Sequence, residues 1–321
     1  MLIDSHREYP TAFRTPLTSS AFRTPLTSSA TAVPTPAPAA SLSVRCHCGA
    51  IRFTSAGDGR PERCHCARCR RSSCSSFVAS LTVAEPLPKE LGLASRYIDT
   101  CSVHGGVERL FCGRCRSSLG SVSAGGSVFR LSLGCVVDES IPDAIALRWQ
   151  TDFTEVGVDE RALWWTARPV RRAAPAEVRT LTGGCSCGGC AFTCRSGREF
   201  QTQHCYCKLC RSLSGSVAQT WVPVRPDGFV WTASETLQLV RTTGHGQRHM
   251  CSRCGCTLSI VYDSQPDCIW PVAGALDDAA LPTDEEALGE ALCRSIHICC
   301  SMMQPWYRLP DDKLPRLKYA G

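Results

Sequence analysis

The sequence predicts a mainly β protein that consists of two tandem zinc-binding domains. Three observations support this fold class: a cysteine pattern that occurs twice, many short apolar runs, and a length of 321 residues, which suits about two domains. The apolar runs are rich in β-branched and aromatic residues and are separated by Gly, Pro, Ser and Asp, as is typical of short strands. Few helices are therefore expected.

The chain divides into four segments by composition. The first 43 residues are rich in Pro, Ser, Thr and Ala, and the segment 12–20 is repeated letter for letter at 21–29. Such a segment cannot bury enough apolar surface to offset the entropy of ordering, so residues 1–43 are predicted to be a disordered tail. The remaining segments are predicted to be a first zinc domain at 44–168, a linker at 169–180 and a second zinc domain at 181–321.

Ten apolar runs predict strands, and one segment predicts a helix. The helix is expected at Asp284–Cys293, because Asp284 can cap its first turn and the glutamates that follow suit a helix N-terminus. The predicted strands are Ala50–Thr54, Phe77–Val83, Arg109–Phe111, Val128–Val137, Ala191–Cys194, Val217–Val224, Leu237–Arg241, Thr257–Tyr262, Ile269–Val272 and Ile296–Cys300.

Fourteen of the 24 cysteines form the repeated pattern. Each copy reads C-x-C, then C-x-C-x-x-C, then C-x-x-C; the two outer pairs recur after 139 residues and the central triad after 141. These spacings are typical of zinc ligands. The predicted metal ligands are Cys46, Cys48, Cys64, Cys66, Cys69, Cys112 and Cys115 in the first copy and Cys185, Cys187, Cys205, Cys207, Cys210, Cys251 and Cys254 in the second.

The two outer pairs of each copy supply four thiolates, which is the closed ligand set of a structural zinc site. An extended strand rises about 3.3 Å per residue and would hold two cysteines that are two residues apart too far from each other to bind one ion, so each C-x-C pair must lie in a bend. Gly49 and Gly188 follow these pairs directly and supply the backbone freedom that a bend requires.

Each central triad supplies three thiolates and leaves the fourth position open, as in catalytic zinc sites. The alternative is that another cysteine, such as Cys74 in the first domain, completes the site and makes it structural. The residue aligned with Cys74 in the second domain is Gly215, which favours an open site there. We therefore expect up to four zinc ions per chain, two structural and two with an open position.

Composition limits the location and partners of the protein. No apolar run is long enough to span a bilayer, and the N-terminus becomes polar at once, so reduced thiols and a cytoplasmic location are expected, with a nuclear location left open. The formal net charge of +6 counts cysteine as neutral. Fourteen thiolates with four Zn²⁺ ions would cancel this excess, which argues against a nucleic-acid partner. The sequence does not define an oligomeric state.

The second copy contains five recognisable motifs, Cys185-Ser-Cys187-Gly188, His204-Cys205-Tyr-Cys207-Lys-Leu-Cys210-Arg211, Cys251-Ser-Arg-Cys254-Gly255, Leu276-Asp277-Asp278 and Pro305-Trp306. Together they resemble the glutathione-dependent formaldehyde-activating enzyme family, which includes centromere protein V. The resemblance covers roughly residues 44–321. The first copy keeps all seven cysteines but has Arg63 in place of a histidine, Arg116 in place of a glycine and Val136-Val137-Asp138 in place of Leu-Asp-Asp.

The resemblance implies a β-tent of antiparallel sheets around a structural zinc, with a second zinc at the triad. It also implies a carbon–sulfur lyase of the S-hydroxymethylglutathione synthase type, which joins glutathione or a related thiol to formaldehyde or another small aldehyde. Because the second copy fits the motifs better, the second domain is expected to be active while the first stabilises the pair. The residues expected to act in catalysis are Cys205, Cys207, Cys210, His204 and Arg211, and those expected to bind glutathione are Lys208, Arg211 and Trp306.

The alternative function is a non-catalytic zinc scaffold that binds protein or chromatin, as the centromeric relative suggests. A chromatin binder would be expected to carry a basic tail. The tail of this chain holds Arg7, Arg14 and Arg23 against Asp4 and Glu8. This weak charge excess favours the enzyme hypothesis.

Overall fold

The computed structural model describes residues 40–57, 59–83, 87–100, 104–157, 180–195, 202–280, 295–312 and 314–319. The expected helix at Asp284–Cys293 and nearly all of the expected tail and linker lie outside these residues. Strand β1 (Ser41–Arg45) begins inside the range predicted for the tail, because Leu42 and Val44 are buried on one face of it.

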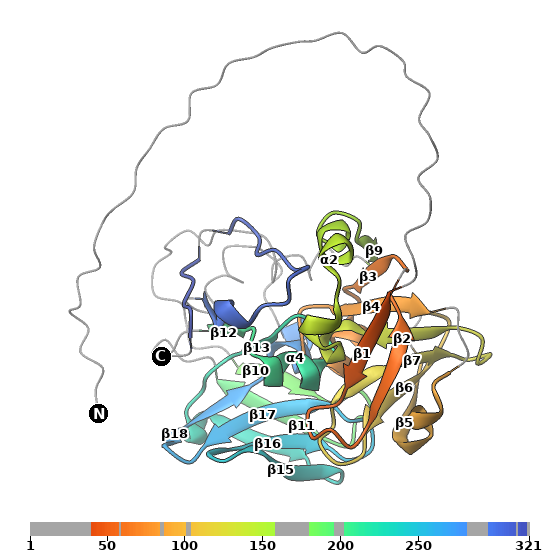
Figure 1. The fold of residues 1–321 in the computed structure, drawn as a ribbon. Coiled ribbons are helices and arrows are strands. Elements are labelled where there is room, and N and C mark those ends of the chain that lie inside the picture. Colours follow the sequence, from red (N-terminus) through yellow and green to blue (C-terminus); the bar gives the residue numbers. More distant parts are fainter. Residues whose placement is uncertain are drawn as a thin grey trace, which may run out of the picture. The chain divides into compact units, whose positions relative to one another are not determined.

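The first repeat contains a two-stranded hairpin and a seven-stranded sheet. The hairpin pairs β1 with β2 (Arg52–Ala56), and the large sheet has the order β5-β6-β7-β8-β4-β3-β9 (Figure 1). Its strands are β3 (Pro61–Cys64), β4 (Val78–Val83), β5 (Ala94–Asp99), β6 (Val107–Cys112), β7 (Ser118–Ser123), β8 (Phe129–Ser132) and β9 (Thr154–Val156).

The second repeat forms three smaller sheets, with the orders β10-β11-β14, β13-β12-β19 and β15-β16-β17-β18. The last of these is the blue-green sheet in Figure 1. The strands are β10 (Thr180–Gly184), β11 (Ala191–Arg195), β12 (Thr202–Cys205), β13 (Gln219–Trp221), β14 (Phe229–Ala233), β15 (Leu237–Thr243), β16 (Gly246–Cys251), β17 (Thr257–Tyr262), β18 (Gln265–Pro271) and β19 (Ser295–Ile298).

The structure confirms a mainly β fold of antiparallel sheets. The parallel pairs among the named strands are β3 with β9 and β12 with β19. Each of the ten predicted runs overlaps a strand, but Val128–Val137 is a strand only as far as Ser132, and Leu133–Cys135 is the 3₁₀ turn η3. The equivalent turn of the second repeat is η7 (Ala273–Ala275). None of the described helices is both long and apolar enough to cross a membrane.

The described residues contain three short helices, α1 (Ala67–Ser73), α2 (Asp143–Trp149) and α4 (Lys208–Ser214). The sequence analysis missed α1 and α4, which start inside the two triads. Each is capped by a cysteine thiol that accepts the backbone N–H three residues later, so a metal ligand takes the usual place of Ser or Asp. The cysteine spacing therefore encodes a helix start as well as a ligand set.

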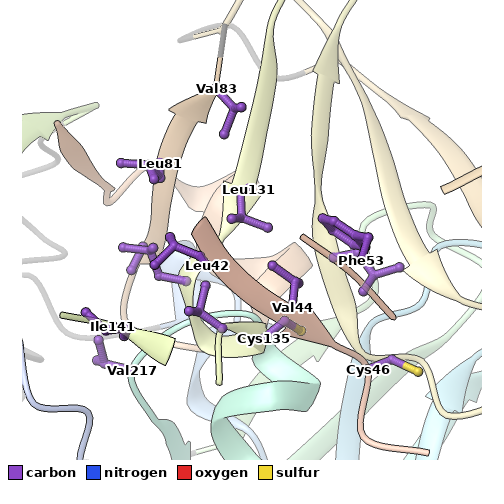
Figure 2. Packing of buried hydrophobic residues seen from close by; sticks show 14 of the residues in the cluster. Leu42, Val44, Cys46, Phe53, Leu81, Val83, Leu131, Cys135, Ile141 and Val217 are labelled. Atoms are coloured by element: carbon purple, nitrogen blue, oxygen red, sulfur yellow. The ribbon is translucent and has the colours of Figure 1, made fainter. Parts of the chain in front are cut away.

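The apolar cores of the repeats interpenetrate. The core around β1, β4 and β8 includes Val217 and Trp306 from the second repeat. Figure 2 shows Val217 close to Ile141 in this cluster. Trp306 is fully buried and packs edge-on against Trp149, with ring centroids 6.2 Å apart. The described residues of the two repeats accordingly belong to one compact unit.

Reciprocal ion pairs also cross the repeat boundary. Arg70 of α1 donates to both carboxylate oxygens of Asp278, at 2.8 and 2.7 Å, and Arg211 of α4 donates to both oxygens of Asp138, at 3.0 and 2.8 Å. The arginines are 2% exposed. Each helix therefore packs against the 3₁₀ turn of the other repeat.

Glycines at those turns make the close approach feasible. A Cβ at Gly134 would lie 2.3 Å from the carbonyl oxygen of Arg211, and one at Gly274 would lie 2.7 Å from that of Arg70. Such distances are far shorter than van der Waals contact. A residue with a side chain at either position would therefore force the helix away from the turn.

Candidate metal centres

The structure brings all fourteen predicted ligands together in four clusters, and these are the metal-type clusters found among the described residues. Two are four-cysteine clusters, made by the outer pairs of each repeat, and two are the triads. In each cluster all sulfur atoms lie within 4.8 Å of one another. The ligand sets predicted from spacing are thus present as spatial groups.

The four-cysteine clusters have the dimensions of a tetrahedral zinc site. The Sγ atoms of Cys46 and Cys48 are 3.6 Å apart, and those of Cys187 and Cys251 are 3.5 Å apart. A zinc ion with Zn–S bonds of about 2.3 Å requires a sulfur–sulfur separation of roughly 3.8 Å. The ligands therefore fit zinc with only small adjustments.

Bends position the C-x-C pairs, as predicted. Gly49 and Gly188 adopt φ angles of +73° and +78°, in the left-handed region that glycine enters without steric cost. The backbone N–H of Gly49 donates to the carbonyl of Cys46 and that of Gly188 to the carbonyl of Cys185, which closes each bend.

Backbone N–H groups also point at the sulfur atoms. The N–H of Ile51 donates to Cys46 Sγ at 3.3 Å, and the N–H of Cys190 donates to Cys185 Sγ at the same distance. Donors around a thiolate favour its charged, ligating form and hold it in place. The pKa of Cys185 is lowered to about 7, first of all by a hydrogen bond with the side chain of Cys190.

A buried arginine accompanies each triad. In the first repeat, Arg109 Nη2 donates to Cys69 Sγ at 3.4 Å, and Arg109 Nε donates to Asp99 Oδ2 at 2.9 Å. In the second, Arg248 Nη2 lies 3.8 Å from Cys210 Sγ, and its other amino group donates to Thr242. The guanidinium charge favours the thiolate form of the neighbouring cysteine. Sequence analysis missed both arginines, although both stand three residues before a C-x-x-C motif.

The triads differ in the charge around them. Arg68 of the first triad is half exposed and lies 3.9 Å from Asp99, so that Arg68, Asp99, Arg109 and Cys69 form a continuous charged chain. Leu209 occupies the position of Arg68 in the second triad. The motif of the first triad therefore contains a solvent-accessible cation, Arg68, that is linked through Asp99 to the buried Arg109. The second triad has no cation at the position of Arg68.

A further thiol lies beside the second triad. Cys299 follows β19 directly and is 6% exposed. Its thiol is in hydrogen-bonding contact with those of Cys205 and Cys207, and these contacts help to raise the pKa of Cys205 and to lower that of Cys207. Cys299 is outside the repeated cysteine pattern and 89 residues from Cys210 along the chain, so the motif spacing did not identify it.

The first repeat has a glycine at the position equivalent to Cys299. The parallel pairs align Cys64 with Val156 and Cys205 with Ile298, so the next residues, Gly157 and Cys299, correspond. Both are left-handed, with φ of +55° and +59°. A residue with a side chain costs roughly 1–2 kcal/mol in this conformation. The second repeat therefore carries a thiol here in spite of backbone strain.

Cys74 does not complete the first triad. This residue is the left-handed C-cap of α1, and its thiol donates to Arg71 O and contacts Cys256 of the second repeat. Burial, first of all, raises the pKa of the Cys74 thiol. Its surroundings are those of a small buried residue beside the second four-cysteine cluster, so the alternative ligand considered for the first triad is not supported.

The other residues expected at the second site make contacts with groups other than the triad thiols. Arg211 donates to Asp138 and to the carbonyl of Tyr206, and Trp306 is in the core described above. Lys208 is exposed, pairs with Glu139 at 3.0 Å and lines a cavity of about 380 Å³ whose lining also includes Cys46. The catalytic and glutathione-binding roles of these residues stay predictions.

His204 is buried on the opposite side of β12 from the triad. Its Nδ1 lies 2.9 Å from Thr220 Oγ1, and its ring packs against that of His297, with centroids 5.1 Å apart. Burial, helped by the neighbouring His297, lowers the pKa of His204 from 6.5 to about 3. The imidazole is therefore neutral at physiological pH and is placed to support the fold.

The depressed pKa of His204 predicts an acid-sensitive fold. Below pH 6.5 the unfolded chain takes up a proton at this residue and the folded chain does not, so the free energy of unfolding falls as pH decreases towards 3. Between pH 6.5 and 5.5, the free energy of unfolding of a His204→Asn variant should fall by about 1 kcal/mol less than that of the parent. Urea unfolding at the two pH values measures this difference. Equal losses would show that His204 titrates normally.

Comparison with known proteins gives one family. A family model described as glutathione-dependent formaldehyde-activating enzyme matches residues 41–151 and again 180–299, together more than half of the chain. A Halomonas elongata protein named "Putative glutathione-dependent formaldehyde-activating enzyme" is 29% identical over 148 residues, covering 44% of this chain and 87% of that protein. A crystal structure of a Rhodobacter sphaeroides protein aligns at 20% identity over 32% of this chain and 89% of that one, with a TM-score of 0.26.

Proposed function

The chain belongs to the glutathione-dependent formaldehyde-activating enzyme family, and on this premise we propose that it forms and cleaves an S-hydroxymethyl adduct between a glutathione-like thiol and formaldehyde or another small aldehyde. This is the reaction of a carbon–sulfur lyase of the S-hydroxymethylglutathione synthase type. The observation that carries the proposal is the three-thiolate cluster beside a buried arginine. Because the ligands must remain thiols, we place the activity in a reducing compartment such as the cytoplasm.

The reaction needs a thiolate and a place for negative charge. The thiol sulfur bonds to the aldehyde carbon, the π bond of the carbonyl breaks, and the proton lost by sulfur ends on the aldehyde oxygen, so no oxidant or reductant is required. Cys64, Cys66 and Cys69 would hold zinc, and the bound ion would supply a fourth position that favours the thiolate form of an incoming thiol. The rest of the chemistry falls to side chains of the protein.

The charged chain of the first repeat is suited to these tasks. Arg109, 3.4 Å from Cys69 Sγ, places a fixed positive charge where the developing alkoxide would form, and Asp99 holds its orientation. Arg68, with 47% of its side chain exposed, is available to a carboxylate of the tripeptide thiol. Buried donors are preorganised and need no rearrangement during the reaction.

The charged groups around the first triad favour the first repeat as the active one, whereas similarity to the family motifs favours the second. The preference for the second remains a prediction. That preference was based on the closer fit of the second copy to the family motifs. The contacts of His204, Lys208 and Arg211 in this copy are with the core or the repeat boundary. We therefore propose that the first triad is the main site of thiol binding.

The test uses the full chain loaded with zinc. Glutathione and ¹³C-formaldehyde are mixed, and exchange NMR compares the rate of adduct interconversion with the spontaneous rate. We expect the protein to raise this rate at least tenfold, which corresponds to about 1.4 kcal/mol of barrier. In the cobalt-substituted protein, glutathione should also shift the visible spectrum.

Two matched variants identify the repeat. Cys66→Ser should remove most of the catalysed exchange, while Cys207→Ser at the equivalent position should leave most of it. The reverse result would assign the activity to the second repeat. A spontaneous rate together with an unchanged cobalt spectrum would contradict the enzyme proposal and favour a zinc scaffold.

A further inference from the structure

We propose that Cys299 is the fourth protein ligand of the second triad, so that Cys205, Cys207, Cys210 and Cys299 form a closed, structural zinc site. Of the four metal-type clusters among the described residues, the first triad would then be the one with a position for an outside thiol. The coordination itself does not depend on the proposed function; the consequence for thiol binding does.

The geometry at β12 and β19 carries the proposal. The parallel register sets Ile298 beside Cys205, and the backbone N–H of Tyr206 donates to the carbonyl of Ile298 at 3.1 Å. Cys299 follows immediately, and its left-handed φ of +59° turns the chain at the end of the strand. Its side chain belongs to the same buried cluster as those of Cys205 and Cys210. The sulfur atom of Cys299 is outside the group of three triad sulfurs that lie within 4.8 Å of one another, so ligation requires the Cys299 side chain to move closer to the triad.

The first repeat provides an internal comparison with the same backbone. The N–H of His65 donates to the carbonyl of Val156 at 3.2 Å, as Tyr206 does to Ile298, and the next residue is again left-handed. That residue is Gly157, which has no side chain to offer. The two triads thus share one local backbone fold. They differ in the residue that follows the parallel strand, which carries a thiol in the second repeat and no side chain in the first.

The chemical consequence follows from ligand number. Zinc sites with four cysteines are structural, whereas three protein ligands and an open position are typical of sites that bind substrate. Thiolate-rich closed sites also exchange their metal slowly, because no position is free for a competing ligand. The two triads should therefore differ in how readily their metal is removed.

The experiment counts rapidly extracted zinc in the full-length protein loaded with four zinc ions per chain. A chromogenic chelator, 4-(2-pyridylazo)resorcinol, is added, and the fast phase is expressed as zinc per chain. The parent should release one ion quickly. Cys299→Gly, which places the first-repeat residue at this corner without backbone strain, should release two. Gly157→Cys should release none.

Cys300→Ser is the matched control, because Cys300 is the adjacent cysteine and its interactions are with Arg316 and Leu317. This variant should behave like the parent. A fast phase that is the same in the parent and in Cys299→Gly would overturn the proposal, and so would a disulfide between Cys299 and a triad cysteine in the zinc-loaded protein. Cys299→Ser, which keeps the side-chain size, repeats the test if the glycine variant does not fold.

The outcome is separable from that of the proposed function. Suppose that the parent, Cys299→Gly and Gly157→Cys rapidly release one, two and no zinc ions, but glutathione does not change the spectrum of the cobalt-substituted protein. The four-cysteine site is then supported and the thiol-binding proposal is contradicted. If glutathione binds and the count does not respond to Cys299, the present inference falls alone.

Discussion

Removal of metal from the four-cysteine clusters is expected to unfold the protein. Zinc binding to such ligand sets contributes about 10–16 kcal/mol in small domains, which is comparable to the whole net stability of a typical protein, about 5–15 kcal/mol. The effect should be large here because each cluster joins segments about 66 residues apart, such as Cys46 and Cys112. Circular dichroism during titration with a strong chelator, followed by addition of zinc, measures the loss and its reversal.

Single variants make this test specific. Cys112→Ser removes one ligand of the first cluster and should lower the free energy of unfolding by several kcal/mol. Cys268→Ser is the control, because Cys268 is equally buried but belongs to none of the four clusters. It should cost about 1 kcal/mol, as an ordinary core substitution does. A metal-free protein with the same unfolding midpoint as the parent would contradict the structural role of the clusters.

Breaking one ion pair at the repeat boundary is expected to have the next largest effect. Asp278→Asn leaves the Arg70 guanidinium buried without its carboxylate, and removal of one partner of a buried pair costs about 3–5 kcal/mol. Asp138→Asn should cost a similar amount, because Arg211 makes the equivalent contact. Denaturant unfolding of the variants measures both costs.

An exposed pair provides the control. Asp263→Asn affects a pair in which both side chains, Arg241 and Asp263, are about half exposed, so it should cost less than about 1 kcal/mol. The double variant Arg70→Met with Asp278→Leu should recover much of the single-variant loss, because no unpaired charge remains. A cost below 1 kcal/mol for both boundary variants would show that the repeats do not depend on these pairs.

Much of the candidate site could be predicted from residue order because metal ligation has strict local rules. Two cysteines separated by one or two residues can face one ion only through a bend or a helix start, so the spacings of Cys46, Cys48 and Cys64, Cys66, Cys69 specify both the ligand set and the local backbone. The strands could also be predicted from the sequence, since they alternate buried and exposed positions, as in β1.

The catalytic roles, which stay predictions, were harder to derive from the sequence than the ligand sets, for a physical reason. Proximity in sequence placed His204 and Arg211 beside the triad, but strand alternation turns His204 to Thr220, and helix α4 turns Arg211 towards Asp138. Direction, rather than distance along the chain, decides what a side chain contacts. Spacing within a motif therefore predicts ligands better than it predicts their neighbours.

The amino-acid sequence by itself determined that this protein has two copies of one cysteine framework, a mainly β fold and membership of the glutathione-dependent formaldehyde-activating enzyme family. Only the tertiary structure decided that the copies share cores and exchange arginine–aspartate pairs, and that Cys299 stands beside one triad where Gly157 stands beside the other. The reason is that ligand spacing is local, whereas these contacts join residues 73 to 208 positions apart, whose meeting depends on how complete sheets and helices pack.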